Sequence, residues 1–184
     1  MNWITKFIKP KIKSLFKKRS LKNEETLWTV CQCKNLIYKE DLKTNYNCCP
    51  KCGAHHKLSC MERFQLFFDE RKFEIIETPV PKDDPLNFID NKKYTDRLKT
   101  ARKITKQDDA VSIAKGKLNN IEVTVGAQDF RFIGGSFGAA SGEAFIAGVQ
   151  HAIENKTPFI FFSCSGGQRM MESAIALMQM TRTT

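Results

Sequence analysis

The sequence predicts an α/β domain preceded by a small zinc ribbon, and three observations support this prediction. The first is a group of four cysteines in the N-terminal third, which are Cys31, Cys33, Cys49 and Cys52. The second is the order strand, strand, helix, strand, helix from Ala110 onward, indicated by the spacing of the apolar residues. The third is a glycine-containing loop before each of these two helices. We therefore divide the chain into residues 1–26, 27–57, 58–109 and 110–184.

Length and charge limit the possible functions. The 184 residues, 41% of them hydrophobic, suffice for one ordinary domain with a small satellite and exclude a disordered tail. Residues 1–57 hold 13 Lys and Arg against 4 Asp and Glu, whereas residues 58–184 hold 17 against 16. A basic segment of this kind suits nucleic acid, an acidic carrier protein, a phosphorylated cofactor or an anionic membrane. No apolar run approaches the roughly 20 residues needed to cross a bilayer, so we expect a soluble protein without a membrane span.

Residues 1–26 form a basic leader. Before Pro10, apolar residues gather on one side of a possible helix and lysines fill the other side. We interpret this segment as a flexible leader. A segment that lies on a surface or docks to a partner is one alternative, and an organelle-targeting peptide is another.

Residues 27–57 indicate a metal site. The stretch from Cys49 to Gly53, CPKCG, has the form of a zinc knuckle, in which two thiolates bracket a turn whose amides can point at the sulfurs. The 15 residues between Cys33 and Cys49 suit a small antiparallel ribbon with residues 36–38 as one strand. So small a ribbon buries little surface, and a metal would supply much of its folding free energy.

We therefore predict one structural zinc, held by four thiolates: Cys31, Cys33, Cys49 and Cys52. The first pair has the spacing C-x-C, one residue shorter than the usual C-x-x-C, which leaves the geometry of the first knuckle open. Three nearby residues could replace a ligand: Cys48, His55 and His56. The alternative is a metal-free ribbon packed with reduced cysteines.

Residues 58–109 are expected to form a helical linker region. An amphipathic helix is predicted at 61–73, where core packing explains its phenylalanines. The prolines between Thr78 and Pro85 predict an extended linker, and the polar residues 92–105 predict another helix. We find no chemistry in this region.

The first of the two glycine-rich loops follows a predicted hairpin. Strands are expected at 111–118 and 121–127 around Asn119-Asn120, a plausible two-residue turn. The stretch 132–138, FIGGSFG, then leads into a helix from about 139 to 155. It matches neither the dinucleotide-binding nor the P-loop motif, which disfavours a nucleotide phosphate site. It would permit close approach of an acyl chain or a cofactor arm, or form a plain turn.

The stretch from Phe159 to Met180 carries the strongest chemical indication. A strand covered on both faces is predicted at 159–162 and a Met-rich helix at 168–180. Ser165 and Gln168 have the form of a capping box, which would begin the helix at once and leave the Gly166 and Gly167 amides without intrahelical partners. Such donors, at the positive end of a helix dipole, favour an enolate or tetrahedral oxygen. The alternative is a tight strand-to-helix turn.

Taken together, these motifs resemble the carboxyltransferase beta subunits of bacterial and plastid acetyl-CoA carboxylases. The resemblance covers nearly the whole chain, through LKNEETLWTVC, CCPKCGAHHK, Tyr94 to Leu98, FIGGSFG, FSCSGGQRM and LMQM. It implies a crotonase-like fold of ββα repeats, of the ClpP/crotonase type. It also implies transfer of a carboxyl group from carboxybiotin, on a separate carrier protein, to acetyl-CoA, giving malonyl-CoA.

The resemblance further implies site residues and partners. The Gly166 and Gly167 amides would donate to the thioester oxygen, and Gly134, Gly135 and Ser136 would shape the wall near the acyl-CoA. The implied partners are a carboxyltransferase alpha subunit in a heterotetramer, a biotin carboxyl carrier protein, and a biotin carboxylase that alone uses ATP. The implied location is the cytoplasm, or the plastid stroma for a plastid-encoded chain. The chain stops after one and a half ββα units where the family continues, so we expect a truncated subunit that is inactive alone.

Two other functions compete with this interpretation. A serine hydrolase would need Ser163 or Ser165 activated by His55, His56 or His151, and the sequence has no G-x-S-x-G motif. A zinc-ribbon nucleic-acid module would use the basic N-terminal third, but few aromatic residues lie near its knuckles. Auxiliary nucleic-acid binding stays open, and a steep salt dependence of RNA or DNA affinity would favour it.

Overall fold

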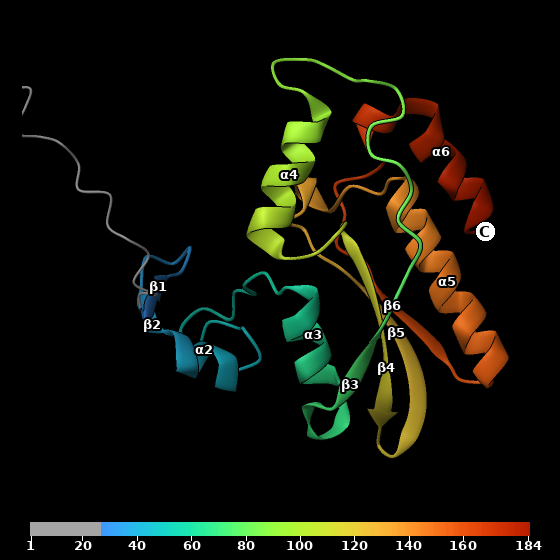
Figure 1. Ribbon diagram of the computed structural model, residues 1–184. Coiled ribbons are helices and arrows are strands. Elements are labelled where there is room, and N and C mark those ends of the chain that lie inside the picture. Colours follow the sequence, from blue (N-terminus) through green and yellow to red (C-terminus); the bar gives the residue numbers. More distant parts are fainter. Residues whose placement is uncertain (1–26) are drawn as a thin grey trace, which may run out of the picture. The chain divides into compact units, whose positions relative to one another are not determined.

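The computed structural model describes residues 27–184, and the basic leader predicted at 1–26 lies outside them (Figure 1). The chain divides into two compact units, Met1–Ala54 and His55–Thr184. Among the described residues, every helix is too short or too polar to span a membrane.

The first unit is built around a two-stranded ribbon. Strand β1 (Trp28–Val30) pairs antiparallel with β2 (Leu36–Tyr38), and helix α2 (Lys39–Thr44) follows at once. The predicted strand at 36–38 is confirmed. Its partner strand, however, precedes the first cysteine pair, and a helix occupies part of the segment expected to form the ribbon. Ile37 and Leu42 pack with Cys31 and Cys49 in a small core.

The second unit contains a four-stranded sheet in the order β3-β4-β5-β6. The first three strands are antiparallel neighbours, and β6 runs parallel to β5. The strands are β3 (Phe73–Ile76), β4 (Val111–Leu118), β5 (Ile121–Gln128) and β6 (Phe159–Phe162). The helices are α3 (Cys60–Phe67), α4 (Tyr94–Thr105), α5 (Ala139–Asn155) and α6 (Ser173–Arg182), with short 3-10 turns at Asp69–Arg71, Ile133–Gly135 and Met170–Glu172. The predicted order from Ala110 onward is thus confirmed.

Helices cover both faces of this sheet, α3 on one side and α5 on the other (Figure 1). Side chains alternate across the strands, so Val123 and Val125 of β5 face the core under α3. Val111 and Ile113 of β4 face the opposite core, which includes Ala144 of α5. Helices α3 and α5 thus hold the sheet between them. The candidate site lies where the parallel strands β5 and β6 end.

The expected helix at 61–73 is wrong in its second half. Helix α3 begins after a capping box between Ser59 and Glu62 and ends at Phe67. Glu70 and Arg71 then adopt positive φ angles of 50° and 59°, which an α-helix cannot contain. The chain reverses there and forms β3, which pairs with β4. The expected linker region therefore contributes an edge strand to the sheet.

The Asn119-Asn120 hairpin turn is confirmed. Both residues have positive φ angles, 51° and 64°, as a two-residue hairpin of the I′ type requires. The Asp69 carboxylate accepts hydrogen bonds from both amides, at 3.0 and 2.9 Å. This contact ties the turn to the segment after α3.

Strand β6 is covered on both faces, as predicted. Phe159 and Phe161 contact Phe145 of α5, whereas Phe162 contacts Phe67 of α3. All four strand residues nevertheless remain half-buried, because within the described residues β6 is an edge strand.

Candidate functional site

Two glycine loops meet where β5 and β6 end. The first glycine loop is residues 129–138, after β5, and the second glycine loop is residues 163–169, after β6. Because these two strands are parallel, both loops leave the sheet at the same edge, where open α/β sheets bind their ligands.

The two loops are joined through their backbones. The Gly166 N–H donates to the Gly134 carbonyl at 2.9 Å, and the Phe137 N–H donates to the Gly167 carbonyl at 2.9 Å. The Arg169 N–H donates back to the Phe137 carbonyl, also at 2.9 Å. The structure thus brings together the glycine pairs that the sequence singled out in separate motifs.

Close contact explains the glycine at position 135. A Cβ there would collide with the Cys164 carbonyl oxygen, and φ is +63°, which disfavours other residues. Gly134 has a similar φ of +66°, but a Cβ there would meet nothing within 4 Å. Of the two, only Gly135 is required by packing of one loop on the other.

The predicted start of the last helix is wrong. Ser165 and Gln168 form no capping box, because the Ser165 Oγ accepts instead from the Gly167 N–H at 3.0 Å. Gln168 pairs with Phe137 in an isolated parallel bridge, and α6 begins only at Ser173. Neither glycine amide is therefore unpartnered, since Gly166 donates to Gly134 and Gly167 donates to Ser165.

Gln128, the last residue of β5, connects the two loops through its side chain. Its side chain is buried, its Nε2 donates to the Gly135 carbonyl at 2.6 Å, and its Oε1 accepts from the Cys164 N–H at 3.2 Å. One amide group thus holds both loops through opposite atoms. No local pattern indicates this role, because Gln128 occupies an ordinary position at the end of a strand.

Arg169 is the largest fully buried side chain, and it anchors the loops to the rest of the unit. Its two terminal nitrogens donate to the Asp109 carboxylate at 2.5 and 2.8 Å. It also donates to the Ser136 carbonyl at 2.6 Å and the Ser136 hydroxyl at 3.1 Å. Burial alone would lower the pKa of Arg169, but the hydrogen bonds and charge of Asp109 outweigh this and raise it. The guanidinium stays charged.

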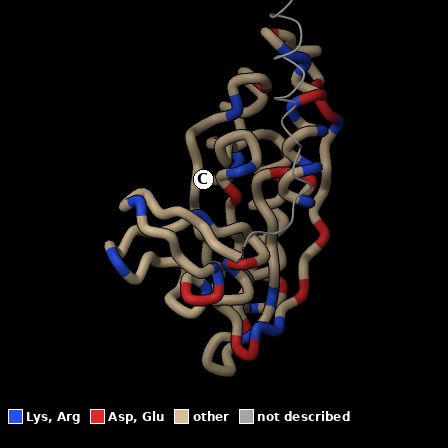
Figure 2. Tube along the Cα trace, turned by 90° about the vertical axis from the view of Figure 1, so that its left-hand side faces the viewer, with Lys and Arg blue, Asp and Glu red and all other residues tan. Residues whose placement is uncertain are grey.

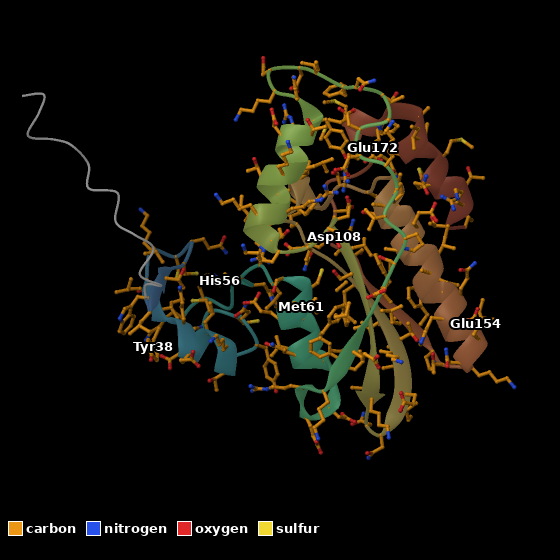
Figure 3. All side chains as sticks on the ribbon, in the orientation of Figure 1. Tyr38, His56, Met61, Asp108, Glu154 and Glu172 are labelled. Carbon is orange, nitrogen blue, oxygen red and sulfur yellow. The ribbon has the colours of Figure 1, made fainter. Side chains whose placement is uncertain are left out.

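A buried carboxylate extends this network to α5. Glu172, labelled in Figure 3, lies in the upper part of that view. It accepts from the Tyr94 hydroxyl at 2.5 Å and from the Ala139 N–H at 2.6 Å. The carboxylate lies close against Gly138, where an added Cβ would be 2.7 Å from a Glu172 oxygen. Burial raises the pKa of Tyr94; the charge of Arg169 opposes this shift, and the hydrogen bond to Glu172 adds to it. The phenol therefore remains protonated and can donate.

The serine hydrolase alternative finds no support from His151. Its Nδ1 lies 3.1 Å from the Thr124 hydroxyl, and Thr124 pairs with Phe159 at the start of β6. Ser163 and Ser165 follow the other end of the same strand. The Ser165 hydroxyl is engaged with Gly167, donating to its carbonyl at 3.2 Å.

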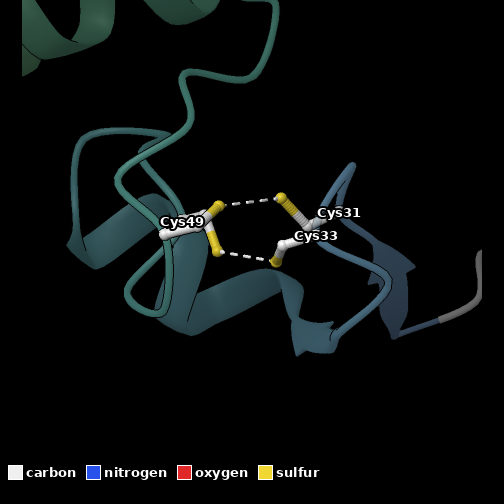
Figure 4. A group of neighbouring side chains, drawn as sticks. Cys31, Cys33 and Cys49 are labelled. Atoms are coloured by element: carbon white, nitrogen blue, oxygen red, sulfur yellow. Dashed lines mark hydrogen bonds between the residues drawn. The ribbon is translucent and has the colours of Figure 1, made fainter.

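A cluster of four cysteines forms a separate site in the first unit. The sulfurs of Cys31, Cys33, Cys49 and Cys52 all lie within 4.8 Å of one another (Figure 4). Cys31 and Cys52 are 3.6 Å apart, and Cys33 and Cys49 are 3.9 Å apart. A tetrahedron with Zn–S distances of about 2.3 Å has edges of about 3.8 Å, so these separations fit a zinc ion.

The C-x-C pair reaches this geometry through a local turn. Lys34 has a φ of 64°, its N–H donates to the Cys31 carbonyl at 2.8 Å, and the Cys31 N–H donates to the Asn35 carbonyl at 3.0 Å. The Asn35 side-chain amide donates to the Cys33 sulfur. This hydrogen bond, together with one from the Asn35 backbone amide, lowers the pKa of Cys33 to about 6. A thiolate is the form that binds metal.

On the other side, Gly53 has a φ of +70° and the Lys51 N–H points at the Cys49 sulfur at 3.4 Å, as a knuckle requires. Cys48 lies outside the cluster, with its sulfur 3.6 Å from the Tyr46 carbonyl.

The mixed sheet, with paired glycine loops at the ends of adjacent parallel strands, has the crotonase-like fold of carboxyl transferase domains. Residues 82–183 match the carboxyl transferase domain family, and the chain belongs to that family. A crystal structure of transcarboxylase 12S superposes on 68% of this chain and 22% of its own, with a TM-score of 0.51 and 24% identity, which supports the fold alone.

Curated relatives match along the whole chain. The acetyl-coenzyme A carboxylase carboxyl transferase subunit beta of Pelagibacter ubique is 50% identical over 188 residues, covering 100% of this chain and 60% of the relative. The subunit of the same name from Gluconacetobacter diazotrophicus is 43% identical over 185 residues, covering 100% and 61%. The chain thus spans about 60% of the length of these relatives.

Proposed function

We propose that this chain acts in the carboxyltransferase beta subunit of an acetyl-CoA carboxylase, where a carboxyl group passes from carboxybiotin on a carrier protein to acetyl-CoA. The observation that carries this proposal is the backbone pairing of the two glycine loops at the ends of β5 and β6. The 50% identity to a subunit of this name supports the same substrates. Carboxybiotin would supply the carboxyl group and, on losing it, the base.

The chain's own contribution would be to stabilise the enolate oxygen of the thioester. The Gly167 N–H is the better placed of the two candidate donors, because its present partner is a serine hydroxyl that can rotate away. The Gly166 N–H is held by the Gly134 carbonyl, so its use would require the loops to separate. Gly134, Gly135 and Ser136 would form the wall beside the acyl group. The Ser136 hydroxyl and carbonyl both accept from Arg169, which fixes that wall.

Gly167→Val, placed in the beta subunit and assembled with its partners, should reduce malonyl-CoA formation by about 100-fold, the scale of losing one oxyanion donor. The φ of Gly167 is +114°, which valine cannot adopt without strain, so the amide would turn away. Steady-state transfer from free or carrier-bound carboxybiotin would measure the effect.

Ser165→Ala serves as the companion variant, because it removes the hydroxyl that occupies this amide while keeping the backbone. It should retain most of the transfer rate. Near-normal turnover by Gly167→Val would place the oxyanion site elsewhere, and complete loss in Ser165→Ala would favour a serine nucleophile.

We also propose that Cys31, Cys33, Cys49 and Cys52 hold one structural zinc ion. The four sulfurs lie within 4.8 Å of one another, and the separations of 3.6 and 3.9 Å are close to the edge of a zinc–sulfur tetrahedron, which supports the proposal. The metal would contribute much of the folding free energy of the first unit, whose apolar core is small.

Cys49→Ser should therefore lose zinc in elemental analysis and should lose the ribbon signals in an NMR spectrum, because one of four ligands is gone. Cys48→Ser is the matched control, since its sulfur lies outside the cluster, and it should keep one zinc per chain. Zinc retained in Cys49→Ser, or lost in Cys48→Ser, would contradict this ligand set.

The partners are part of the same proposal: a carboxyltransferase alpha subunit in a heterotetramer, a biotin carboxyl carrier protein and a biotin carboxylase that uses ATP. Support comes from α6, whose Leu177, Met178 and Met180 are each more than half exposed, as expected of a surface that a partner covers. Acidic and basic residues are interspersed along the described chain (Figure 2), which favours no continuous nucleic-acid face there. The bacterial origin of the relatives supports a cytoplasmic location.

A further inference from the structure

Gln128 lies in neither glycine loop and yet hydrogen-bonds to both. It is 6% exposed, its Nε2 donates to the Gly135 carbonyl of the first glycine loop, and its Oε1 accepts from the Cys164 N–H of the second glycine loop. The partners fix the orientation of the amide, because a carbonyl can only accept and an N–H can only donate. A side chain in this position therefore needs one donor and one acceptor at the spacing of an amide.

The strand end that carries Gln128 is itself held by the sheet. Gln128 is in register with Val111 of β4, and the next residue, Asp129, donates its N–H to the Ala110 carbonyl at 2.8 Å. The side chain thus projects from the paired end of a strand, whereas its two partners belong to loops. Groups on strands are held more precisely than groups on loops. We therefore expect Gln128 to fix the positions of the two loops.

The two groups that Gln128 holds lie at a close contact between the loops. A Cβ added to Gly135 would collide with the Cys164 carbonyl oxygen, so the two backbones pack directly on each other. One residue before Gly135, the Gly134 carbonyl accepts from the Gly166 N–H. Gly166 directly precedes Gly167, whose N–H is the proposed donor to the enolate oxygen. A change in the separation of Gly135 and Cys164 would therefore move the Gly167 amide.

We propose that Gln128 is a positioning residue for carboxyl transfer, which sets the separation of the two glycine loops and thereby the direction of the Gly167 N–H. This inference rests on the proposed function. Both polar atoms of the Gln128 side chain are engaged with the loops, so its effect on the enolate passes through the Gly167 amide. An interaction that matters only in the transition state lowers kcat and kcat/KM together and leaves KM unchanged.

Gln128→Met, placed in the beta subunit of the assembled enzyme, tests this proposal. Methionine has a similar length but can make neither hydrogen bond. The kcat for malonyl-CoA formation should therefore fall by about 100-fold, the scale expected when reacting groups are misplaced by about 1 Å. The KM for acetyl-CoA should stay unchanged. Steady-state kinetics over a range of acetyl-CoA concentrations separates the two constants.

Gln179→Met is the matched control. Gln179 is also a buried glutamine, 4% exposed, and its side chain donates to the Ile175 carbonyl and accepts from Arg182, which lie outside both glycine loops. Its replacement removes a buried amide of the same kind and should leave kcat at the wild-type level. Thermal unfolding shows whether each variant is folded. Equal falls in kcat for the two variants, or a normal kcat in folded Gln128→Met, would overturn the proposal.

Gln128→Glu is a second variant, which keeps the shape of the side chain and remains informative if Gln128→Met does not fold. A protonated carboxyl group can donate to Gly135 and accept from Cys164, whereas an ionised one cannot donate and would repel the Gly135 carbonyl. The ratio of variant to wild-type kcat should therefore rise as the pH is lowered from about 8 to about 6. A side chain that only stabilised the fold would leave this ratio constant, and a constant ratio would contradict the proposal.

The ionisable groups near position 128 do not change the direction of this pH dependence. They are the carboxylate of Asp129, next in the chain, and the side chains that line the same pocket wall as Gln128, which are His55, His56, Lys57, Arg63 and Cys164. The cations would favour the ionised form of the new carboxyl group, whereas burial and the Gly135 carbonyl would favour the protonated form. This balance sets the pH at which the ratio rises. The direction follows from the Gly135 carbonyl, which needs a donor.

The outcome is separable from that of the proposed function. Malonyl-CoA formation by the wild type, with a normal kcat in folded Gln128→Met, would disprove the positioning role and leave the activity standing. If the wild-type assembly formed no malonyl-CoA, the proposed function would fail, and hydrogen exchange of residues 163–169 would decide the role of Gln128. Exchange there should be faster in Gln128→Met than in Gln179→Met, and equal exchange would show that Gln128 does not hold the loops.

Discussion

Arg169→Ala is expected to lower the free energy of unfolding by about 3–5 kcal/mol, the range found when one partner of a buried ion pair is removed. The Asp109 carboxylate, 7% exposed, would lose both hydrogen bonds from the guanidinium and remain buried with its charge. The Ser136 carbonyl would lose its donor as well. Urea unfolding followed by circular dichroism measures the change.

Arg182→Ala is the control for this experiment. Arg182 pairs with Glu143 on the surface, where its side chain is 43% exposed, so its loss should cost no more than about 1 kcal/mol. The double change Arg169→Met with Asp109→Asn should recover part of the stability, because the Asp109 charge is then no longer buried without its partner. Equal costs for Arg169→Ala and Arg182→Ala would show that water reaches Asp109 and that the network does not hold the loops.

Gly135→Ala should be far more damaging than Gly134→Ala, although the two glycines are adjacent and have nearly the same φ. Both alanines incur about 1–2 kcal/mol for the left-handed backbone. Only the Cβ at position 135 would also collide with the Cys164 carbonyl, a backbone atom fixed by β6, at a further cost of about 1–3 kcal/mol. The collision would push the loops apart and, in the assembled enzyme, reduce carboxyl transfer by about 100-fold.

We would measure unfolding curves and carboxyl transfer rates of the two variants side by side. These measurements test whether the collision at position 135 is what makes its substitution more damaging. Gly134→Ala should keep most of the activity, because its Cβ meets nothing within 4 Å. If the two variants behaved alike, the second glycine loop would be able to move away from the first, and a fixed distance between them would not be needed for catalysis.

The elements that the sequence predicted correctly are those defined by local patterns. The hairpin at Asn119-Asn120, the strand at 159–162 and the helix ending at Asn155 each follow from a short periodic run with a turn residue at its boundary. The four-cysteine cluster follows likewise from knuckle spacing, even with one residue fewer in the first pair.

The predicted end of α3 and the predicted start of α6 were wrong, because contacts between residues distant in sequence outweighed the local preference for helix. The helix predicted at 61–73 ends at Phe67, since the chain must reverse for Phe73 to join the sheet beside β4. The capping box at Ser165 does not form, since the following residues pair with Phe137 instead. Residues 61–73 fit a helix locally, and Ser165 and Gln168 fit a capping box. Neither stretch contains a residue pattern that indicates the distant contact which replaces the predicted element.

Local sequence patterns were enough to predict the order of the elements from Ala110 onward, the four clustered cysteines and the two glycine motifs, because each depends on residues close together along the chain. The tertiary structure alone decided that the glycine motifs meet, that Gln128 bridges them, and that Arg169 is buried against Asp109, 60 residues earlier in the chain. From the sequence alone, an arginine in a polar turn is expected to be exposed to solvent. Only the folded chain supplies the carboxylate and carbonyl groups that make its burial favourable.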